Sequence, residues 1–365
     1  MAIIKPFKAV RPSRDKVALV SSKSFDAYTD KELDAKLEFN PFTFLHIINP
    51  GYKYHKEFTG EQRFQMIHNR YEEFKENKIF IKDTTDSFYI YESLDAHDSF
   101  CGIIAATAVD DYINGCIKKH EGTIKKREEL FESYLKTTGF NAEPVLLTYE
   151  DDENFNKLLL TIQEKRPEYE FSTTDKKLHR LWLVNDEIHI GKITSFFEKK
   201  EALYIADGHH RSASSSLLKK DLQKENNHHN GTENYNYFMS YIIPESNLKI
   251  SEFNRFVKDL NGLTIDEFLI ELDTYFKDKL SGADLKASKP HPEIFIKAAI
   301  SAGVSHTECF VIEDSTNGIA AAKKGNFFCV AFKSTNSKDQ DYSKADMLIS
   351  DFEAIKYDKV RDLFN

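Results

Sequence analysis

Apolar residues recur in the first part of this chain with two different periods, and each period predicts a type of element. Residues 61–76 carry apolar side chains three and four positions apart, with charged residues between them, which predicts a helix. The apolar run 87–92 predicts a strand, and 102–109 predicts another strand or a buried segment. A second helix is expected over 123–137. The pattern continues with strands expected at 144–149, 202–206 and 238–243, and with helices at 155–165, 212–224 and 264–280.

Turn-forming residues separate these elements. Asn185-Asp186 lies between two short apolar runs, 181–183 and 188–190, which predicts a β-hairpin. The polar segment 225–234, ENNHHNGTEN, is expected to be an exposed, mobile loop. Thr264 followed by Glu267 forms a capping box, which predicts a helix start at this point.

The pattern changes beyond about residue 280. After a short linker, SGADLKASKP, the segment alternates between helices and strands, which indicates a parallel α/β layer. We therefore expect an α/β protein with an α+β N-terminal domain over 1–280 and a partial Rossmann-like segment over 281–365. The expected elements are helices at 292–302 and 317–324 and strands at 309–313, 327–332 and 346–349.

Composition narrows the class of protein. The chain has 365 residues, of which 41% are hydrophobic, enough for two domains with separate cores. The net charge of −9 argues against nucleic acid or an anionic membrane surface as the main partner. We find no run of about 20 apolar residues to span a membrane and no signal-peptide core. The four cysteines form no CxxC pair and are expected to be reduced core thiols, so a cytoplasmic location is expected.

The segment 204–211, YIADGHHR, is the first candidate for chemistry. A strand is expected to end at Asp207-Gly208 and a helix to begin just afterwards, so free backbone N–H groups and the helix dipole favour an anion there. Arg211 adds a planar fork for phosphate oxygens, and His209 and His210 add donors. Asp207 is suited to hold a divalent cation or to accept a proton from a hydroxyl. The alternative is an ordinary turn in which both histidines satisfy nearby backbone groups.

The second candidate is His120-Glu121-Gly122-Thr123, followed by Lys126, Arg127 and Glu128. The motif resembles the metalloprotease HExxH only superficially, because its fifth position is Ile124. His120, Glu121 and Thr123 would instead orient a substrate hydroxyl or ligate Mg²⁺ through water. The alternative is that Thr123 is simply the N-cap of the following helix.

Several motifs in order resemble the DUF1015 family over about residues 1–280. They are HExT with its downstream KxxR, NAEPVLLTY, YIADGHHRSASS and FMSYIIPESNLKI. The DGHHR box is similar to that of ParB-like serine kinases, which use ATP or ADP to phosphorylate free L-serine. The resemblance implies that Asp207 to Arg211 hold nucleotide phosphates and that a glutamate activates the serine hydroxyl. Glu121 is our candidate for that glutamate, with His120 beside it. Family members are expected to be longer, with a further C-terminal region.

From residue 281 the sequence resembles the later half of a haloacid dehalogenase-type phosphatase of the β-phosphoglucomutase kind. The resemblance implies that Lys289 neutralises phosphoryl charge and that Glu313 and Asp314 hold Mg²⁺. The family also needs an aspartate nucleophile after an apolar strand, and this chain has none. Asp339-Gln340-Asp341 has the letters DxD but follows a polar run.

These features lead to four hypotheses. The first is a kinase that transfers phosphate from ATP or ADP to L-serine or a similar small hydroxyl compound, with phosphates bound by Gly208 to Arg211, Thr123 and Arg127. The second is a nucleotide-binding regulatory module without turnover. The third is a haloacid dehalogenase-like phosphatase that is inactive for lack of its nucleophile. The fourth is a fusion in which neither part is active.

Overall fold

A computed structural model describes residues 2–52, 56–96, 98–249, 262–275, 280, 285, 287–333 and 340–355. The chain divides into two compact units, Met1–Ile250 and Ser251–Asn365. Helix α10 (Ile265–Tyr275) therefore belongs to the second unit, whereas the change of sequence family was placed near residue 280. Half of the linker 281–290 (residues 281–284 and 286), Phe276 and Asp339 lie outside the described residues.

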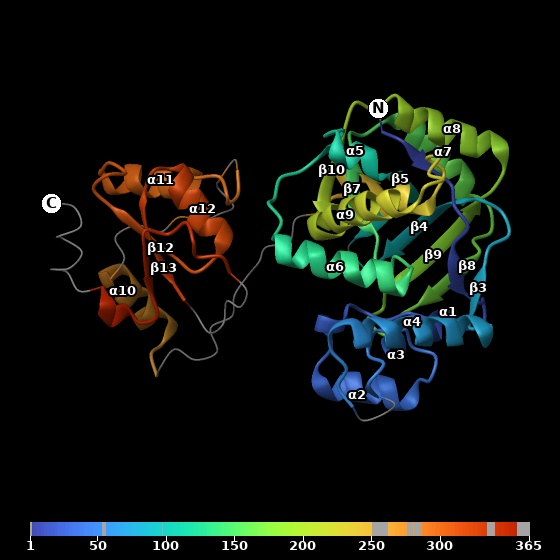
Figure 1. Ribbon diagram of the computed structural model, residues 1–365, viewed down its shortest axis with the longest axis horizontal. Coiled ribbons are helices and arrows are strands. Elements are labelled where there is room, and N and C mark those ends of the chain that lie inside the picture. Colours follow the sequence, from blue (N-terminus) through green and yellow to red (C-terminus); the bar gives the residue numbers. More distant parts are fainter. Residues whose placement is uncertain are drawn as a thin grey trace. The chain divides into compact units, whose positions relative to one another are not determined.

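The secondary structure alternates between helices and strands along most of the chain (Figure 1). The remaining α-helices are α1 (Val17–Val20), α2 (Asp30–Phe39), α3 (Leu45–Ile48), α4 (Gly60–Glu76), α5 (Val109–Ile113), α6 (Lys125–Thr138), α7 (Glu153–Gln163), α8 (Glu187–Glu198), α9 (His209–Glu225), α11 (Glu293–Ala302) and α12 (Thr316–Lys324). The strands are β1 (Ile4–Lys5), β2 (Val10–Pro12), β3 (Phe80–Lys82), β4 (Phe88–Leu94), β5 (Ser99–Ala108), β6 (Ile117–Lys118), β7 (Val145–Tyr149), β8 (Tyr169–Ser172), β9 (Leu178–Val184), β10 (Leu203–Asp207), β11 (Tyr237–Pro244), β12 (Phe310–Glu313), β13 (Phe328–Phe332) and β14 (Met347–Ile349).

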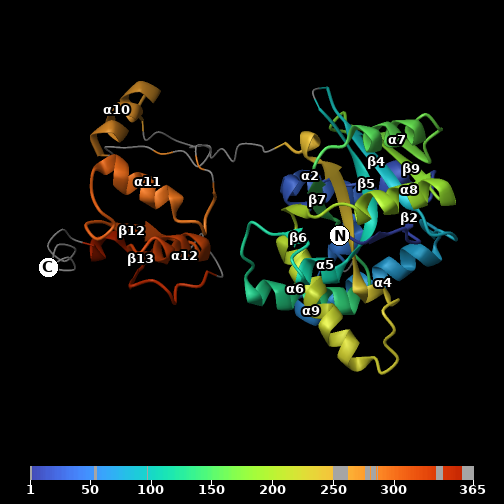
Figure 2. The same ribbon diagram turned by 90° about the horizontal axis from the view of Figure 1, so that it is seen from above.

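The first unit is built on a mixed sheet of nine described strands. Their order is β6-β10-β7-β11-β5-β4-β9-β8, and β1 pairs with β5. Helices α6 and α9 pack on each other, and Figure 2 shows them together on one side of the strands, with α7 on another. Phe88, Phe197 and Phe238 are almost fully buried in the core between the sheet and its helices. This burial of aromatic and aliphatic surface is the main stabilising contribution to the unit.

The second unit has a three-stranded parallel sheet in its described residues, in the order β12-β13-β14. Ile319, Phe327 and Cys329 form part of its small core. The predicted alternation of helix and strand is confirmed here, and so is the parallel pairing. The α/β fold class is confirmed for the protein as a whole.

The predicted hairpin at Asn185-Asp186 is wrong. Residues 178–184 form β9, which pairs with β8 and β4, whereas residue 187 begins helix α8. The Asp186 side chain accepts a hydrogen bond from the backbone N–H of His189 at 3.0 Å and so caps this helix. An aspartate between two apolar runs fits an N-cap as well as a turn, because both use its side-chain oxygen to accept a local backbone N–H.

The polar loop 225–234 is more ordered by hydrogen bonds than its composition suggested. The Glu233 carboxylate accepts the backbone N–H groups of Asn230 and Gly231, at 2.7 and 3.0 Å. It also lies 3.0 Å from Nδ1 of His229. The expected exposure of the loop is confirmed at His228, which is exposed, whereas His229 is half-buried.

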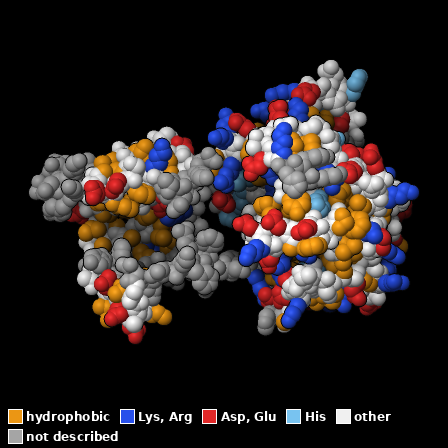
Figure 3. Space-filling model, turned by 90° about the horizontal axis from the view of Figure 1, so that it is seen from below, with side chains coloured by type: hydrophobic (Ala, Val, Ile, Leu, Met, Phe, Trp, Pro, Cys, Tyr) orange, Lys and Arg blue, Asp and Glu red, His pale blue; other side chains and the backbone are white. Residues whose placement is uncertain are grey.

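On the face of the first unit shown in Figure 3, positively charged Lys and Arg side chains are interspersed with negatively charged Asp and Glu side chains.

Candidate functional site

The DGHHR segment lies where strand β10 passes into helix α9, as the sequence predicted, but the helix begins at His209, three residues before the expected start at residue 212. Gly208 has φ 98° and ψ 29°, in the left-handed region, and His209 is the first residue of the helix. The first backbone N–H groups of a helix have no partner within it, and α9 is 17 residues long. The start of α9 therefore offers donors and a positive dipole end beside the turn.

Gly208 is required for both its backbone angle and its lack of a side chain. A Cβ at this position would lie 3.3 Å from Val145 Cα and 3.3 Å from Arg211 Cζ. For a residue with a Cβ, the left-handed backbone conformation is less stable by about 1–2 kcal/mol. Gly208 thus allows the turn and the close approach of the Arg211 guanidinium together.

Gly208→Ala is expected to lower the free energy of unfolding by about 1–2 kcal/mol and to displace Arg211. Urea unfolding followed by fluorescence of Trp182 measures this, because the chain's single tryptophan is buried in the first unit. Gly139→Ala is the matched control, since Gly139 has φ 77° but no atom within 4 Å of its Cβ position. If both variants behave alike in stability and in ligand binding, the contact with Arg211 has no role.

Arg211 is held at the turn by several acceptors. Its Nη2 donates to Asp207 Oδ2 at 2.7 Å, and its Nη1 donates to the backbone carbonyl of Pro144. The Glu143 carboxylate lies 3.7 Å from Nη1. The Arg211 side chain is 28% exposed and that of Asp207 is 70% exposed. The guanidinium is therefore positioned by a fixed carbonyl, while the exposed carboxylate of Asp207 is free to give way to an anionic ligand.

The two predicted clusters meet in space. The rings of His120 and His209 lie 4.5 Å apart, edge to face, and His209 Nδ1 is 3.6 Å from Glu121 Oε2. Among the described residues, the buried atoms His209 Nε2 and His210 Nδ1 have no hydrogen-bond partner. The simple alternative, in which both histidines satisfy nearby backbone groups, is therefore wrong for these two nitrogens. A buried polar atom without a hydrogen bond destabilises the folded state, so these two nitrogens are candidates to bond to a ligand.

Burial lowers the pKa of both histidines. The neighbouring His120 lowers the pKa of His209 further, and Arg127 does the same to His210. Both imidazoles are therefore neutral near pH 7, each with one N–H to donate and one nitrogen to accept. They act as hydrogen-bonding groups and not as fixed positive charges.

The stability of the first unit is expected to fall as the pH is lowered through about 6.5, the ordinary histidine value. Histidines in the unfolded chain take up protons in this range, whereas His209 and His210 in the folded chain have lowered pKa values and stay neutral. Because the unfolded state binds more protons, lowering the pH stabilises it relative to the folded state. Urea midpoints between about pH 7.5 and 5.5 measure this before carboxylates titrate. His209→Gln should flatten the slope, whereas the exposed control His228→Gln should not. An equal slope in both variants would contradict the assignment.

Thr123 does not cap the following helix. Helix α6 has Ile124 at its N-cap position without a side-chain cap, and the Thr123 hydroxyl donates to Glu128 Oε1. The N-cap alternative for Thr123 is therefore wrong. Arg127 lies in the first turn of α6, near enough to His210 to lower its pKa. Both predicted residues thus lie in the segment that adjoins the histidines.

The residues that resemble a haloacid dehalogenase-type phosphatase, Lys289, Glu313 and Asp314, lie in the second unit, near the end of β12. Lys289 Nζ forms an ion pair with Glu313 Oε1, and the Ser315 hydroxyl donates to Glu313 Oε2 at 3.1 Å. Glu313 is 8% exposed, and a Cβ on Gly318 would lie 2.0 Å from its Oε2. Glu313 is therefore held in a pocket that only glycine leaves open. Asp314 follows at the same strand end.

The region around Asp341 positions the start of helix α12. The Gln340 side chain accepts the backbone N–H of Thr316 at 2.9 Å, and the Asp341 N–H donates to the Thr316 hydroxyl at 2.8 Å. The side-chain hydroxyl of Ser343 lowers the pKa of Asp341, which is exposed. These contacts give Gln340-Asp341 a structural role at the helix start.

Some of these residues have side chains suited to bind Mg²⁺. The described part of the chain has no group of three or more His, Cys, Asp or Glu side chains that would hold a metal ion. Mg²⁺ usually takes one or two carboxylates together with water and substrate phosphates. Asp207 would supply a carboxylate to an ion in the first unit, and Glu313 and Asp314 would supply carboxylates to a separate ion in the second unit, with the rest of each coordination brought by water and a bound phosphate.

Sequence analysis gave no contact or role at the first site to three residues that contribute to it. Pro144 and Glu143 contact Arg211, and Glu128 accepts from Thr123. Glu143 and Pro144 lie in the motif NAEPVLLTY, which supported only the family resemblance. Pro144 also had a local signal, because proline without an N–H is typical at the start of a strand. The role of its carbonyl depends on β7 pairing with β10, which no local pattern encodes.

None of the described helices is both long enough and apolar enough to cross a membrane. Among curated proteins, the chain is 39% identical over 77 residues to a haloacid dehalogenase-like hydrolase domain-containing protein of Arabidopsis thaliana, 21% of this chain and 24% of that protein. It is 30% identical over 78 residues to validoxylamine A 7'-phosphate phosphatase of Streptomyces hygroscopicus, 21% of this chain and 36% of that protein. The chain thus spans about a quarter to a third of the length of these relatives.

A solved structure gives a similar partial match. β-Phosphoglucomutase from Clostridium difficile is 28% identical over 23% of this chain and 36% of its own, with a TM-score of 0.21. A score this low says nothing about the fold of the whole chain. In the sequence comparisons above, the similarity to haloacid dehalogenase-like proteins covers about a fifth of the chain.

A much longer match comes from one family model. The DUF1015 family, described as a protein of unknown function, matches residues 4–348. This range extends beyond residue 280, where sequence inspection placed the end of the resemblance, and it includes Lys289, Glu313 and Asp314. It contains both clusters that meet at the β10–α9 turn. The chain belongs to the DUF1015 family.

Proposed function

We propose that the first unit is a nucleotide-dependent phosphotransferase that phosphorylates L-serine or a similar small hydroxyl compound. In this proposal the phosphates of ATP or ADP lie at the start of α9, beside Gly208 and Arg211. His209 and His210 donate to phosphate oxygens, and Glu121 faces the acceptor hydroxyl.

One observation carries the proposal. His120-Glu121 and Asp207 to Arg211 are more than 80 positions apart, yet His209 Nδ1 lies 3.6 Å from Glu121 Oε2. An anion site and a carboxylate base are thereby adjacent, as transfer of a phosphoryl group to a hydroxyl requires. The unpartnered nitrogens His209 Nε2 and His210 Nδ1 add donors that a ligand would satisfy.

The groups at this site account for every bond formed and broken in the transfer and for the proton that is released. The acceptor hydroxyl oxygen attacks the terminal phosphorus, forming a new O–P bond as the bond to the leaving nucleotide oxygen breaks. The hydroxyl proton passes to the Glu121 carboxylate, and Arg211 and the α9 N–H groups stabilise the charge on the phosphoryl oxygens. Magnesium supplied with the nucleotide would neutralise further phosphate charge.

The proposal is tested by incubating the full chain with Mg²⁺, L-serine and either ATP or ADP. Phosphoserine is expected by ³¹P NMR with one of the two nucleotides. Glu121→Gln should lower the rate by roughly 100-fold or more, as loss of a general base does, while nucleotide affinity measured by calorimetry stays unchanged. Glu129→Gln, an exposed residue of α6, is the control.

The other outcomes are equally informative. Nucleotide binding without phosphoserine, or without phosphorylation of other small hydroxyl compounds, would favour a regulatory nucleotide-binding module in place of a kinase. Absence of binding by both nucleotides would overturn the phosphate site itself.

A second function is favoured by the Lys289–Glu313–Ser315 contacts. We propose that this segment binds phosphate and Mg²⁺ without hydrolysing a phosphate ester, because the sequence has no aspartate after an apolar strand in the position that the chemistry needs. Turnover of p-nitrophenyl phosphate by the full chain, lost in Lys289→Ala, would overturn this proposal.

A further inference from the structure

Strand β10, which leads into the glycine turn, carries an exposed aromatic ring. Tyr204 is 51% exposed, whereas its neighbours Leu203 and Ile205 are buried in the core. Side chains alternate between the two faces of a strand, so Tyr204 points away from that core. A single exposed aromatic residue is common on protein surfaces and by itself indicates no ligand. Its significance depends on which other groups share this face of the sheet.

A β-bulge places Asp207 on the same face as Tyr204. In the antiparallel pairing of β10 with β7, Tyr204 is opposite Thr148 and Asp207 is opposite Leu146, and β10 has one more residue between these pairs than β7 has. Strict alternation would instead put Ala206 on this face. Thr148 and Leu146 are two positions apart on β7, about 7 Å, and share a face. The Tyr204 ring and the Asp207 carboxylate therefore lie on one side of the sheet.

This side of the sheet continues to the groups that the proposed function assigns to phosphate. Arg211 Nη2 donates to Asp207 Oδ2 at 2.7 Å, and α9 begins directly after Gly208. Leu146, which is half-buried, lies opposite Asp207 and two positions from the residue opposite Tyr204. A nucleotide has the same order of parts, with a flat base, a ribose and then the phosphates. With its base on Tyr204 and its phosphates at Arg211, the gap between them is one that a ribose spans.

The Thr148 hydroxyl is a second and independent indication. Thr148 is 7% exposed, and its Oγ1 has no hydrogen-bond partner among the described residues. Because Thr148 is directly opposite Tyr204, its side chain lies beside that residue on the same face. A buried hydroxyl without a partner destabilises the folded state, and a purely apolar ligand would leave it unpaired. A nucleobase suits both groups, since it has a π face for the ring and polar edge atoms for the hydroxyl.

We propose that the base of the nucleotide binds on the Tyr204 face, which we define as Tyr204, Thr148, Leu146 and Asp207. The base stacks on the Tyr204 ring, the Thr148 hydroxyl bonds to its polar edge, and the ribose passes over Leu146 towards Arg211. This assignment rests on the proposed phosphotransferase function, because the phosphates of the same ligand lie at the start of α9. It gives the site a means to distinguish a nucleotide from inorganic polyphosphate.

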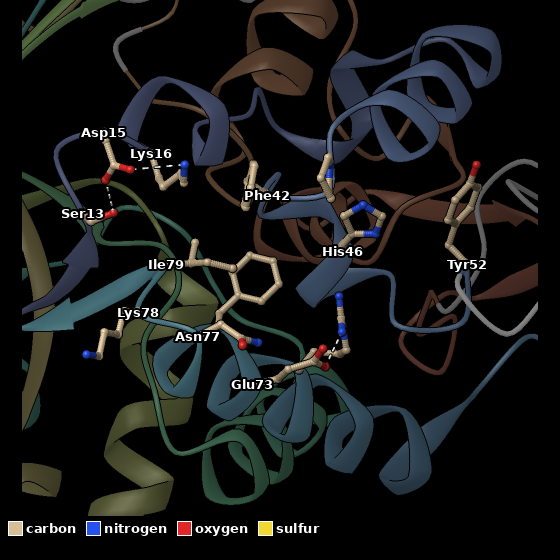
Figure 4. A pocket seen from close by; sticks show the side chains of 13 residues that line it. Ser13, Asp15, Lys16, Phe42, His46, Tyr52, Glu73, Asn77, Lys78 and Ile79 are labelled. Atoms are coloured by element: carbon tan, nitrogen blue, oxygen red, sulfur yellow. Dashed lines mark hydrogen bonds and ion pairs between the residues drawn. The ribbon is translucent and has the colours of Figure 1, made fainter.

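The cavity drawn in Figure 4 is a different part of the first unit. Its volume is about 710 Å³, and its walls come from the segment before α1, from the region 41–52 around α3 and from the end of α4. Its cations Arg70 and Lys16 already have carboxylate partners in Glu73 and Asp15. None of its described lining residues belongs to the Tyr204 face. Different variants would therefore affect a nucleotide bound there.

The test compares the affinities of the full chain for a nucleotide and for inorganic tripolyphosphate, measured by calorimetry with Mg²⁺ and without L-serine. The nucleotide is whichever of ATP and ADP binds more tightly. Tyr204→Ala is expected to weaken nucleotide binding roughly 5- to 100-fold, the contribution of one base stacked on an aromatic ring. Binding of tripolyphosphate, which has no base, should stay within about twofold of the wild type. Because each ligand is compared with itself, their difference in charge does not matter.

Further variants separate the ring from other effects. Tyr204→Phe keeps the ring and should keep the nucleotide affinity, whereas Thr148→Val removes the hydroxyl at nearly constant shape and should weaken the nucleotide a few-fold. Phe39→Ala on α2, at a residue that is 78% exposed, is the control for loss of an exposed ring and should change neither affinity. Arg211→Ala should weaken both ligands, because both carry phosphates. Trp182 unfolding curves show that each variant is folded.

The outcomes distinguish this inference from the proposed function. If both ligands bind and Tyr204→Ala changes neither affinity, the phosphate site stands and the base site is overturned. Equal weakening of both ligands in Tyr204→Ala would also overturn it, because the ring would then act on the phosphate site. Unchanged nucleotide affinity in Thr148→Val would overturn the hydrogen bond to the base. Weaker nucleotide binding in Lys16→Gln would place the nucleotide in the cavity of Figure 4 and overturn the inference. If neither ligand binds the wild type, the phosphate site and this inference are both wrong.

Discussion

Arg211→Ala is expected to lower the rate of nucleotide-dependent phosphoserine formation roughly 30- to 1,000-fold. The variant loses the guanidinium fork beside the start of α9, and with it about 2–4 kcal/mol of charge-assisted hydrogen bonding to phosphoryl oxygens. Arg211→Lys keeps the charge but not the fork, so it should fall between the wild type and the alanine variant. Initial rates at saturating L-serine measure the effect.

The control for this prediction lies on the same helix. Lys224 is at the far end of α9, and its side chain is 67% exposed. Lys224→Ala should therefore retain the wild-type rate. Arg211 also donates to the Pro144 carbonyl, so the Trp182 unfolding curve must show that Arg211→Ala is folded under the assay conditions. A folded Arg211→Ala variant with a rate within about threefold of the wild type would remove Arg211 from the site.

Phe197→Ala is expected to lower the free energy of unfolding of the first unit by about 3–5 kcal/mol. Phe197 is fully buried on α8. Its ring lies 5.4 Å from that of Tyr149 and 5.5 Å from that of Phe155, centre to centre, and both contacts are edge to face. The truncation removes the buried surface and these ring contacts and leaves a cavity that a close-packed core fills only in part.

Urea unfolding followed by Trp182 fluorescence measures this loss. The tryptophan is 5% exposed on β9, and its Nε1 donates to the Lys165 carbonyl at 2.8 Å, so it reports on this unit and not on the other. Leu160→Ala is the control, because Leu160 on the neighbouring helix α7 is 62% exposed. Its change should stay within about 0.5 kcal/mol. A Phe197→Ala effect below about 1 kcal/mol would mean that the core re-packs around the gap.

The elements themselves were predictable where the hydrophobic period was long and clean. The helical spacing over 61–76 appears as α4, Gly60–Glu76, and the apolar run 87–92 as part of β4. In the second unit, all five expected elements within 292–349 are present, and their parallel pairing is confirmed. Strands β1 and β6 have only two residues each, too few to show the alternation of apolar and polar residues that predicts a strand. Their pairing depends on neighbours in the sheet and not on their own residues.

The site divides in the same way. Local sequence determined the strand, the glycine turn and the helix start at Asp207 to Arg211, because backbone angles and helix ends depend on nearby residues. It also determined that Glu313 ends a strand and that Asp314 follows it. It did not determine that the strand before the turn, β10, lies parallel to β6 and antiparallel to β7.

That sheet order is what brings the site together. Pairing of β10 with β6 places the residues after β6, His120 and Glu121, beside His209, and pairing with β7 brings the Pro144 carbonyl to Arg211. The sequence by itself determined which groups have the right chemistry and what local backbone carries them. Only the tertiary structure decided which of them meet, because contacts between distant segments arise from burial and strand pairing and not from local periodicity.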